Sequence, residues 1–347
     1  MQIGDRPIGA SVRPFVVAEM SGNHNQSLDR ALAIVDAAAD AGADAIKLQT
    51  YTADTITLDV AGGDFVIADP NSPWAGRNLH ELYRAAYTPW EWHAPIFEHA
   101  QRRGLIAFSS PFDESAVDFL ETLAAPAYKI ASFEAVHLPL IRKAAATGKP
   151  LVISTGMATL EEIGDAVDAA RGAGCRDLVL LKCTSTYPAP AASTNLRTLI
   201  EMRDRFGCEV GLSDHTVGTG AAVAAVALGA VFIEKHLTIS RADGGVDSSF
   251  SMEPHEFRML VDESMRAWEA LGTISYGPTE SDRASVALRR SIYIAEDIPA
   301  GTTLSRRHIR VVRPGAGLAP KHFEEVLGRV TTRDARKGTP LTWDLLG

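Results

Sequence analysis

The segment EVGLSDHTVGTGAAVAAVALGAVFIEKH, residues 209–236, predicts a strand, a helix and a second strand. Two short apolar runs, at 209–213 and 231–236, enclose the helical pattern, and each becomes polar only at its carboxyl end. Short, nearly all-apolar strands are typical of a parallel sheet covered by helices, because both faces of each strand are buried. The segment therefore predicts one unit of a parallel α/β fold.

The same alternation extends over roughly the first 270 residues. Helical patterns such as 27–41, 159–173 and 254–271 follow the apolar runs, and Ser27 and Gly42 are suited to cap the first of these helices. Eight consecutive units favour a closed (β/α)8 barrel, the TIM-barrel fold, over an open doubly wound sheet. The predicted strands are 15–19, 43–49, 105–110, 127–132, 151–155, 178–183, 209–213 and 231–236.

The pattern predicts two domains. Residues 1–272 form the barrel, residues 273–285 are polar and predict a linker, and residues 286–347 predict a small mixed domain. A domain of about 60 residues has a marginal core of its own, so we expect it to pack on another surface. Residues 50–88 form a long insertion between the first and second units, suited to a lid or a substrate-binding loop.

Charge is unevenly distributed along the chain. The 347 residues carry a net charge of −9; residues 281–347 have 12 Lys/Arg and 7 Asp/Glu, a net of +5, which leaves 22 and 36, a net of −14, for the rest. The acidic bulk argues against nucleic-acid binding, and the basic tail suits an anionic ligand or an acidic surface, although ordinary solvated charge is the alternative interpretation.

Composition narrows the class of protein further. The hydrophobic fraction of 46% is ordinary for a globular chain and excludes disordered and fibrous classes. No apolar stretch approaches the length of a membrane helix, and the first residues do not resemble a signal peptide. The three cysteines lack CxxC spacing and predict a reduced set without disulfides. We therefore expect a cytoplasmic protein with no membrane contact.

Polar residues occur at the carboxyl end of nearly every predicted strand. In a (β/α)8 barrel these ends and the following loops form the active site. No GxGxxG follows the first strand and no GxxxxGK[ST] is present, which weakens dinucleotide and NTPase interpretations. The strand-end residues include Glu19, Asn23, Lys47, Gln49, Ser110, Lys129, Ser132, Ser154, Ser185, Tyr187, Ser213, His215, Glu234 and His236.

Two histidines end adjacent predicted strands. His215 and His236 are placed to converge on one divalent ion, and two neutral imidazoles suit Mn²⁺, Fe²⁺ or Zn²⁺ better than Ca²⁺ or Mg²⁺. The alternative is that each is an ordinary hydrogen-bonded histidine. Cys183 also lies at a strand end, but we interpret it as a buried structural cysteine rather than a nucleophile.

Two lysines stand within apolar runs. Burying Lys47 or Lys129 is costly unless the ammonium group is paired. One interpretation is a salt bridge with Glu19 or Glu234. The other, favoured by the nearby serines, is a site for a small dianion such as phosphate, which uses positive charge and several hydroxyl donors.

Nine motifs taken together resemble the sialic acid synthase family. They are AEMSGNHNQSLDRAL, GADAIKLQTYTADT, FSSPFDESAVDFL, AYKIASFE, ISTGMATLEEI, LKCTSTYP, GLSDHT, IEKHLT and RADGGVDSSFS, and they span the barrel in order. The tail SIYIAEDIPAGTTLSRRHIRVVRPGAGL is similar to that family's SAF, or antifreeze-like, β-clip domain. AEMSGNHNQ, IKLQTYTADT and RADGGVDS resemble the pseudaminic acid synthase branch.

The resemblance implies a metal-dependent condensation of phosphoenolpyruvate with an amino-sugar aldehyde, releasing phosphate. In that branch the sugar is 2,4-diacetamido-2,4,6-trideoxy-β-L-altrose, and the metal is Mn²⁺, with Mg²⁺ or Co²⁺ as alternatives. The nearest rivals are legionaminic or N-acetylneuraminic acid synthesis and a heptulosonate-type synthase. A non-catalytic sugar-binding or ice-binding protein is a distant alternative. It would need no metal.

The resemblance also implies roles for individual residues. Arg313 would reach the neighbouring subunit's site in a domain-swapped homodimer, and Glu19 would transfer a proton at the sugar or the attacking water. Ser185 stands where many relatives have asparagine, and Gln26 where the sialic branch has glycine. Implied metal ligands are His215 and His236; phosphoenolpyruvate contacts are Lys47, Ser110, Lys129, Ser132, Ser154, Ser185 and Ser213; sugar-side contacts are Glu19 and Asp247; further substrate contacts are Asn23, Gln49 and Tyr187.

Overall fold

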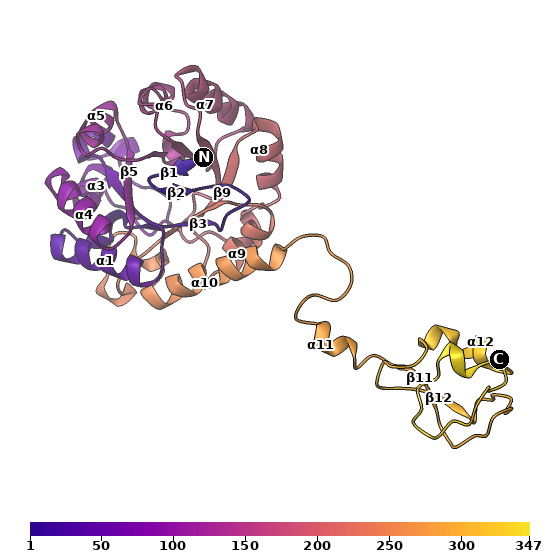
Figure 1. Cartoon of the computed structure of the whole chain (residues 1–347). Helices are drawn as coiled ribbons and strands as arrows, with labels where there is room; N and C mark the ends of the chain where they lie inside the picture. The colour runs from indigo at the N-terminus through magenta and orange to yellow at the C-terminus, as the bar shows by residue number, and fades with distance from the viewer. The chain divides into compact units, whose positions relative to one another are not determined.

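Eight parallel strands close into a barrel in the first part of the chain (Figure 1). The computed structural model describes residues 1–347, and the barrel lies within Met1–Gly272, so the predicted (β/α)8 fold is confirmed. In order around the barrel, β10 precedes β3 and closes the sheet. The strands are β3 (Phe15–Glu19), β4 (Ala45–Thr50), β5 (Ile106–Pro111), β6 (Tyr128–Ile130), β7 (Leu151–Ser154), β8 (Leu178–Cys183), β9 (Glu209–Asp214) and β10 (Phe232–His236).

A helix follows each strand and covers the outside of the barrel (Figure 1). Ser27 accepts a hydrogen bond from the backbone N–H of Arg30 and caps the first helix, as predicted, and Gly42 follows its end with φ +85°. The helices are α1 (Leu28–Asp40), α4 (Trp90–Arg102), α5 (Glu114–Thr122), α6 (Leu138–Ala145), α7 (Leu160–Gly172), α8 (Thr198–Phe206), α9 (Gly220–Ala227) and α10 (Pro254–Leu271).

The long insertion lies within the second strand–helix unit of the barrel, between β4 and α4. The sequence analysis expected it between the first and second strand–helix units. The difference arises because the segment follows the second strand directly, before that unit's helix begins. It contains α2 (Ala53–Ile56) and α3 (Leu79–Ala86). Single 3-10 turns η1 (Ser21–His24), η2 (Gly63–Phe65), η3 (Ser132–Glu134), η4 (Ala191–Ser193), η5 (Arg241–Asp243) and η6 (Ser248–Phe250) lie in the insertion and in other loops of the barrel unit.

The barrel core has two layers. One apolar cluster fills the space between strands and helices. A second fills the barrel interior, where Phe15, Phe108 and Phe232 pack with Ile3 of the β1–β2 hairpin (Gln2–Ile3 with Arg6–Pro7) and with Ile8, which directly follows it. Phe15 and Phe232 are the first residues of β3 and β10, so the hairpin closes the amino end of the barrel. The polar side chains lie at the opposite, carboxyl end.

The chain divides into two compact units, the barrel unit Met1–Gly272 and a second unit, Thr273–Gly347, which has its own apolar core. An antiparallel pair, β11 (Ser291–Ile294) and β12 (Ile309–Val312), packs with residues from the following loops, including Leu341 and Leu345. Its short helical segments are α11 (Arg283–Val286), η7 (Pro320–His322), α12 (Phe323–Val326) and η8 (Trp343–Leu345). No helix of either unit combines the length and the apolar character needed to cross a bilayer.

Candidate active site

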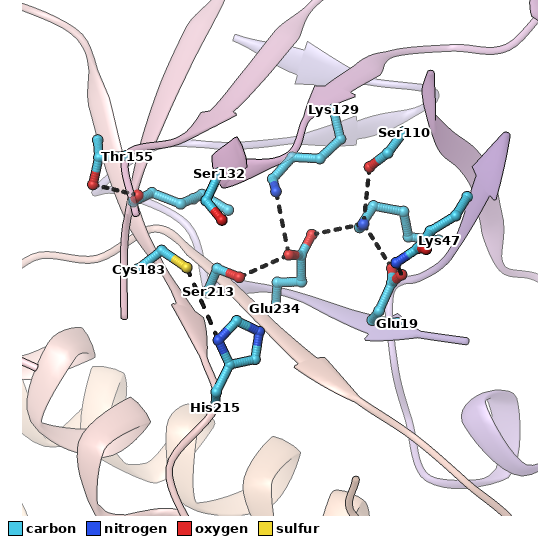
Figure 2. A network of polar contacts seen from close by, with 12 residues as sticks. Glu19, Lys47, Ser110, Lys129, Ser132, Thr155, Cys183, Ser213, His215 and Glu234 are labelled. Carbon is cyan, nitrogen blue, oxygen red and sulfur yellow. Dashed lines mark hydrogen bonds and ion pairs between the residues drawn. The ribbon is translucent and has the colours of Figure 1, made fainter. Parts of the chain in front are cut away.

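Four charged side chains meet inside the carboxyl end of the barrel (Figure 2). Lys47 Nζ lies 2.7 Å from Glu19 Oε2 and 3.7 Å from Glu234 Oε2. Lys129 Nζ lies 3.4 Å from Glu234 Oε1. All four are buried. The ammonium groups are therefore paired, as the salt-bridge interpretation of the lysines expected, and the dianion site stays a prediction.

Serine hydroxyls from five strand ends surround this cluster. Lys47 Nζ donates to Ser110 Oγ at 3.0 Å, and Ser213 Oγ donates to Glu234 Oε1 at 2.9 Å. Ser132 Oγ and Ser185 Oγ are 2.8 Å apart. Ser154 Oγ is buried without a hydrogen-bond partner. Because a buried hydroxyl is rarely left unpaired, Ser154 is available to bond a water molecule or a polar ligand at this point.

The pKa values of the charged cluster are shifted in opposite directions. Burial raises the pKa of Glu19, although Lys47 opposes the shift. For Glu234 burial acts in the same upward direction, but Lys129 and Lys47 outweigh it and lower the pKa. Burial lowers the pKa of Lys129. Two carboxyl groups with separated pKa values form a pair in which one holds a proton more readily than the other.

The two histidines lie side by side as predicted, with ring centroids 5.3 Å apart. His215 Nδ1 donates to the carbonyl oxygen of Thr184 at 3.0 Å, which leaves Nε2 to face other partners. His236 Nδ1 is buried without a partner, and burial followed by the nearby His215 lowers the pKa of His236 well below its usual value. A neutral imidazole with an unsatisfied buried nitrogen is suited to a metal.

The histidine pair has no third protein ligand of the usual kind, since no group of three His, Cys, Asp or Glu side chains is arranged to hold a metal ion. The two imidazoles therefore fit a divalent ion only if substrate or water completes its coordination. Cys183 Sγ lies 4.0 Å from His215 Nδ1, so folding places a histidine beside this thiol although none is adjacent in sequence. The chain contains three free cysteines and no disulfide, as predicted.

Three further predicted substrate contacts, Gln49, Tyr187 and Asp247, are buried or border the cluster. Gln49 Nε2 donates to Glu19 Oε1 at 2.9 Å, and the Tyr187 ring lies 4.4 Å from that of His215, so both border the cluster. Asp247 is buried and accepts a hydrogen bond from Ser21 Oγ.

The remaining predicted substrate contacts are Asn23 and Arg313. Asn23 Nδ2 donates to Leu237 O and to Ser251 Oγ, both at 2.9 Å, so its amide nitrogen ties two loops together. Arg313 is exposed on the second unit, and its approach to a site remains a prediction.

Three residues near the site were missed by the sequence analysis. Glu134 in η3 has a buried Oε2 without a hydrogen-bond partner, and burial raises its pKa to about 7. A carboxylate four residues after the end of β6 was the available signal, but the sequence analysis stopped at Ser132. Trp74 and Phe250 contact Tyr187, and no local sequence pattern predicts that these two residues lie near the site.

Comparisons with known proteins agree with this architecture. A model of the NeuB family matches residues 34–276, and a model of the SAF domain matches residues 289–347. Pseudaminic acid synthase of Campylobacter jejuni is 43% identical over 98% of both chains, and that of Helicobacter pylori is 40% identical over 95% of this chain and 97% of its own.

More distant relatives share the same layout. N,N'-diacetyllegionaminic acid synthase of Legionella pneumophila is 35% identical over 98% of this chain and 97% of its own. The structure of N-acetylneuraminic acid synthetase from Leptospira borgpetersenii, 29% identical, covers 82% of this chain and 94% of its own with a TM-score of 0.73.

Proposed function

Because this chain belongs to the NeuB family and ends in a SAF domain, we propose that it is a pseudaminic acid synthase. It condenses phosphoenolpyruvate with 2,4-diacetamido-2,4,6-trideoxy-β-L-altrose and releases phosphate. The sugar assignment rests on identity of 40 to 43% to pseudaminic acid synthases over nearly the whole chain, against 35% to a legionaminic acid synthase. The geometric observation that carries the reaction class is the buried lysine and serine cluster beside the histidine pair.

Phosphoenolpyruvate binds at the lysine and serine cluster. The unpaired Ser154 hydroxyl, together with the Lys47 and Lys129 ammonium groups, offers donors to a phosphate and a carboxylate. Glu234, and Glu19 when it is ionised, offset the two lysine charges, so the phosphate and carboxylate of phosphoenolpyruvate need further positive charge. The remaining serine contacts are Ser110, Ser132, Ser185 and Ser213.

That further charge has two proposed sources. The first is a divalent ion held by His215 and His236, since enzymes of the NeuB family are generally metal-dependent. When bound, such an ion supplies Lewis-acid polarisation of the sugar's aldehyde oxygen. The family resemblance favours Mn²⁺ as this ion, with Co²⁺ or Mg²⁺ as alternatives. The second source is Arg313 of the partner subunit in a domain-swapped homodimer, which we retain as a proposal.

Glu19 is the proposed proton carrier at the sugar side. Its raised pKa allows it to hold a proton close to neutral pH, and Gln49 and Lys47 fix its two carboxyl oxygens. It would deliver or accept the proton at the sugar oxygen or at the attacking water. Asp247 and Tyr187 orient the sugar. We expect the reaction to take place in the cytoplasm.

A sugar panel tests the proposal. The purified chain is supplied with phosphoenolpyruvate, Mn²⁺ and one amino sugar at a time, and phosphate release and the product are measured. We expect the highest kcat/KM with 2,4-diacetamido-2,4,6-trideoxy-β-L-altrose. A preference for the sugars of legionaminic or N-acetylneuraminic acid synthesis would overturn the sugar assignment. No phosphate release with any sugar would favour a non-catalytic binding protein.

A further inference from the structure

Trp74 links the β4–α4 insertion to the loop that follows β10. Its indole Nε1 donates to the carbonyl oxygen of Val246 at 2.8 Å, across 172 residues of sequence. Val246 directly precedes Asp247, which borders the proposed sugar site. The insertion is therefore held against the site by a specific hydrogen bond rather than extending away from it.

The indole ring is the outermost member of an aromatic cluster, defined here as Trp74, Tyr187 and Phe250. Trp74 lies 5.6 Å from Tyr187 and 6.1 Å from Phe250, measured between ring centroids. Tyr187 lies 4.4 Å from His215, and Phe250 lies 5.1 Å from His236. Tyr187 and Phe250 thus border the histidine pair that is proposed to bind the metal and the sugar's aldehyde end, and Trp74 packs on both of these rings.

Trp74 and Phe250 present only apolar surface to this region. Phe250 has no polar atom, and the single N–H of Trp74 is already bonded to Val246. Neither can replace the water that a sugar hydroxyl loses on binding. An apolar group of the sugar, in contrast, gains from leaving water against these rings.

We propose that Trp74 and Phe250 form an apolar wall of the sugar subsite and select amino sugars with a methyl group at C6 over sugars with a hydroxyl there. This inference rests on the proposed function, because it assumes a sugar aldehyde at the histidine pair. A hydrophobic pocket discriminates against one added hydroxyl by only about 100-fold, and against one missing methylene by roughly 10- to 200-fold. We therefore expect selectivity of about that size.

The test compares two sugars in matched variants. Probe sugars are 2,4-diacetamido-2,4,6-trideoxy-β-L-altrose and N-acetylmannosamine, which has hydroxyls at C4 and C6. Trp74→Ala and Phe250→Ala should each lower the ratio of the two kcat/KM values about tenfold or more, mainly through a higher KM for the first sugar. The KM for phosphoenolpyruvate should change little.

Two further variants separate the wall from the hydrogen bond. Trp74→Phe keeps an aromatic ring and loses the N–H, so it should keep most of the selectivity. Trp90 also donates to a backbone carbonyl, that of Tyr51 at 3.2 Å, but lies outside the aromatic cluster, so Trp90→Phe is the matched control and should leave the ratio unchanged. If Trp74→Ala does not fold, Trp74→His places a polar ring in the wall and must also lower the ratio.

The outcomes distinguish this inference from the proposed function. If wild-type protein turns over the diacetamido sugar but Trp74→Ala and Phe250→Ala reduce kcat/KM equally for both sugars, the wall does not select and the inference is wrong. Equal loss of selectivity in Trp74→Phe and Trp74→Ala would assign the effect to the hydrogen bond and overturn the wall as well. If wild-type protein does not use the diacetamido sugar at all, the proposed function itself fails.

Discussion

Lys235 Nζ lies 2.6 Å from Asp214 Oδ2, and both side chains are wholly buried. The two residues are register partners on adjacent strands, and each precedes, in sequence, the histidine proposed as a metal ligand. Lys235 Nζ also donates to the carbonyl oxygen of Thr216 at 2.6 Å. Because successive strand side chains alternate between faces, this pair lies behind the site and fixes the spacing of the two histidines from outside.

Removing one partner of this pair should strongly destabilise the protein. Lys235→Met leaves the Asp214 carboxylate buried without its counter-ion, and such a loss typically costs about 3 to 5 kcal/mol. Urea unfolding of Lys235→Met, Asp214→Asn and the double variant measures the coupling. The double variant should lose less than the sum of the single losses. Strict additivity would show that the pair makes no joint contribution.

An exposed pair of equal length is the control. Lys143 Nζ lies 2.6 Å from Asp118 Oδ1, but both side chains are substantially exposed. Water and salt screen such a pair, so Lys143→Met should leave the free energy of unfolding close to that of the wild-type protein.

Gly156 is the glycine on which the proposed phosphate site depends most directly. Its φ is +48°, and a Cβ there would collide with Ser132 Cβ and lie 2.8 Å from Ser185 Oγ. Gly156→Ala should therefore displace two serines and lower kcat/KM for phosphoenolpyruvate roughly 10- to 100-fold, because small misplacements at a reacting centre are costly. Steady-state kinetics with varied phosphoenolpyruvate gives the readout.

Gly164 provides the matched substitution. It lies inside α7, and a Cβ there meets nothing within 4 Å. Gly164→Ala should raise the free energy of unfolding by about 0.5 to 1 kcal/mol and leave kinetics unchanged. If both alanine variants showed the same kinetic loss, a specific role for Gly156 would be excluded.

Much of this arrangement follows from local sequence patterns. Short apolar runs alternating with helical patterns predicted the barrel, and parallel strands necessarily bring Lys47, Lys129 and the histidines to one end. Consecutive units are neighbours in a barrel, so the proximity of His215 to His236 could also be predicted.

The insertion and the loop contacts could not be predicted in this way. Trp74 meets Phe250 only because a hydrogen bond joins two loops far apart in sequence, and no periodicity encodes that contact. The family resemblance implies that Asn23 contacts substrate, which stays a prediction, because its Oδ1 is buried without a partner. The bonds of its Nδ2 to Leu237 and Ser251 could not be predicted, since the strand pattern does not specify them.

Stability should depend on pH through Glu134. Its folded-state pKa is raised to about 7, mainly by burial, whereas an unfolded glutamate has a pKa of about 4.3. The native carboxyl group therefore contributes stability that is complete below the unfolded pKa and is lost as the pH rises through about 7. The difference in unfolding free energy between wild-type and Glu134→Gln protein should fall between pH 5 and pH 8. A difference independent of pH would contradict the raised pKa.

Metal dependence should follow from the histidine pair. Exhaustive chelation should abolish phosphate release, and Mn²⁺ should restore it in wild-type protein but not in His215→Ala or His236→Ala. Direct Mn²⁺ binding, measured by calorimetry, should weaken in both variants. Full activity after chelation would exclude the proposed role of the metal.

Subunit complementation tests whether Arg313 acts in the partner's site. In a swapped homodimer, Arg313→Ala and His236→Ala homodimers each lack one component at both sites. A mixed dimer has one complete site, because the barrel of the Arg313→Ala chain receives the intact tail of the other chain. Equal coexpression should therefore restore about a quarter of wild-type activity, since half of the dimers are mixed and each has one working site. Arg310→Ala, an exposed arginine on β12, the strand that directly precedes Arg313, should be active without mixing. If mixing restores nothing, Arg313 acts within its own subunit or not at all.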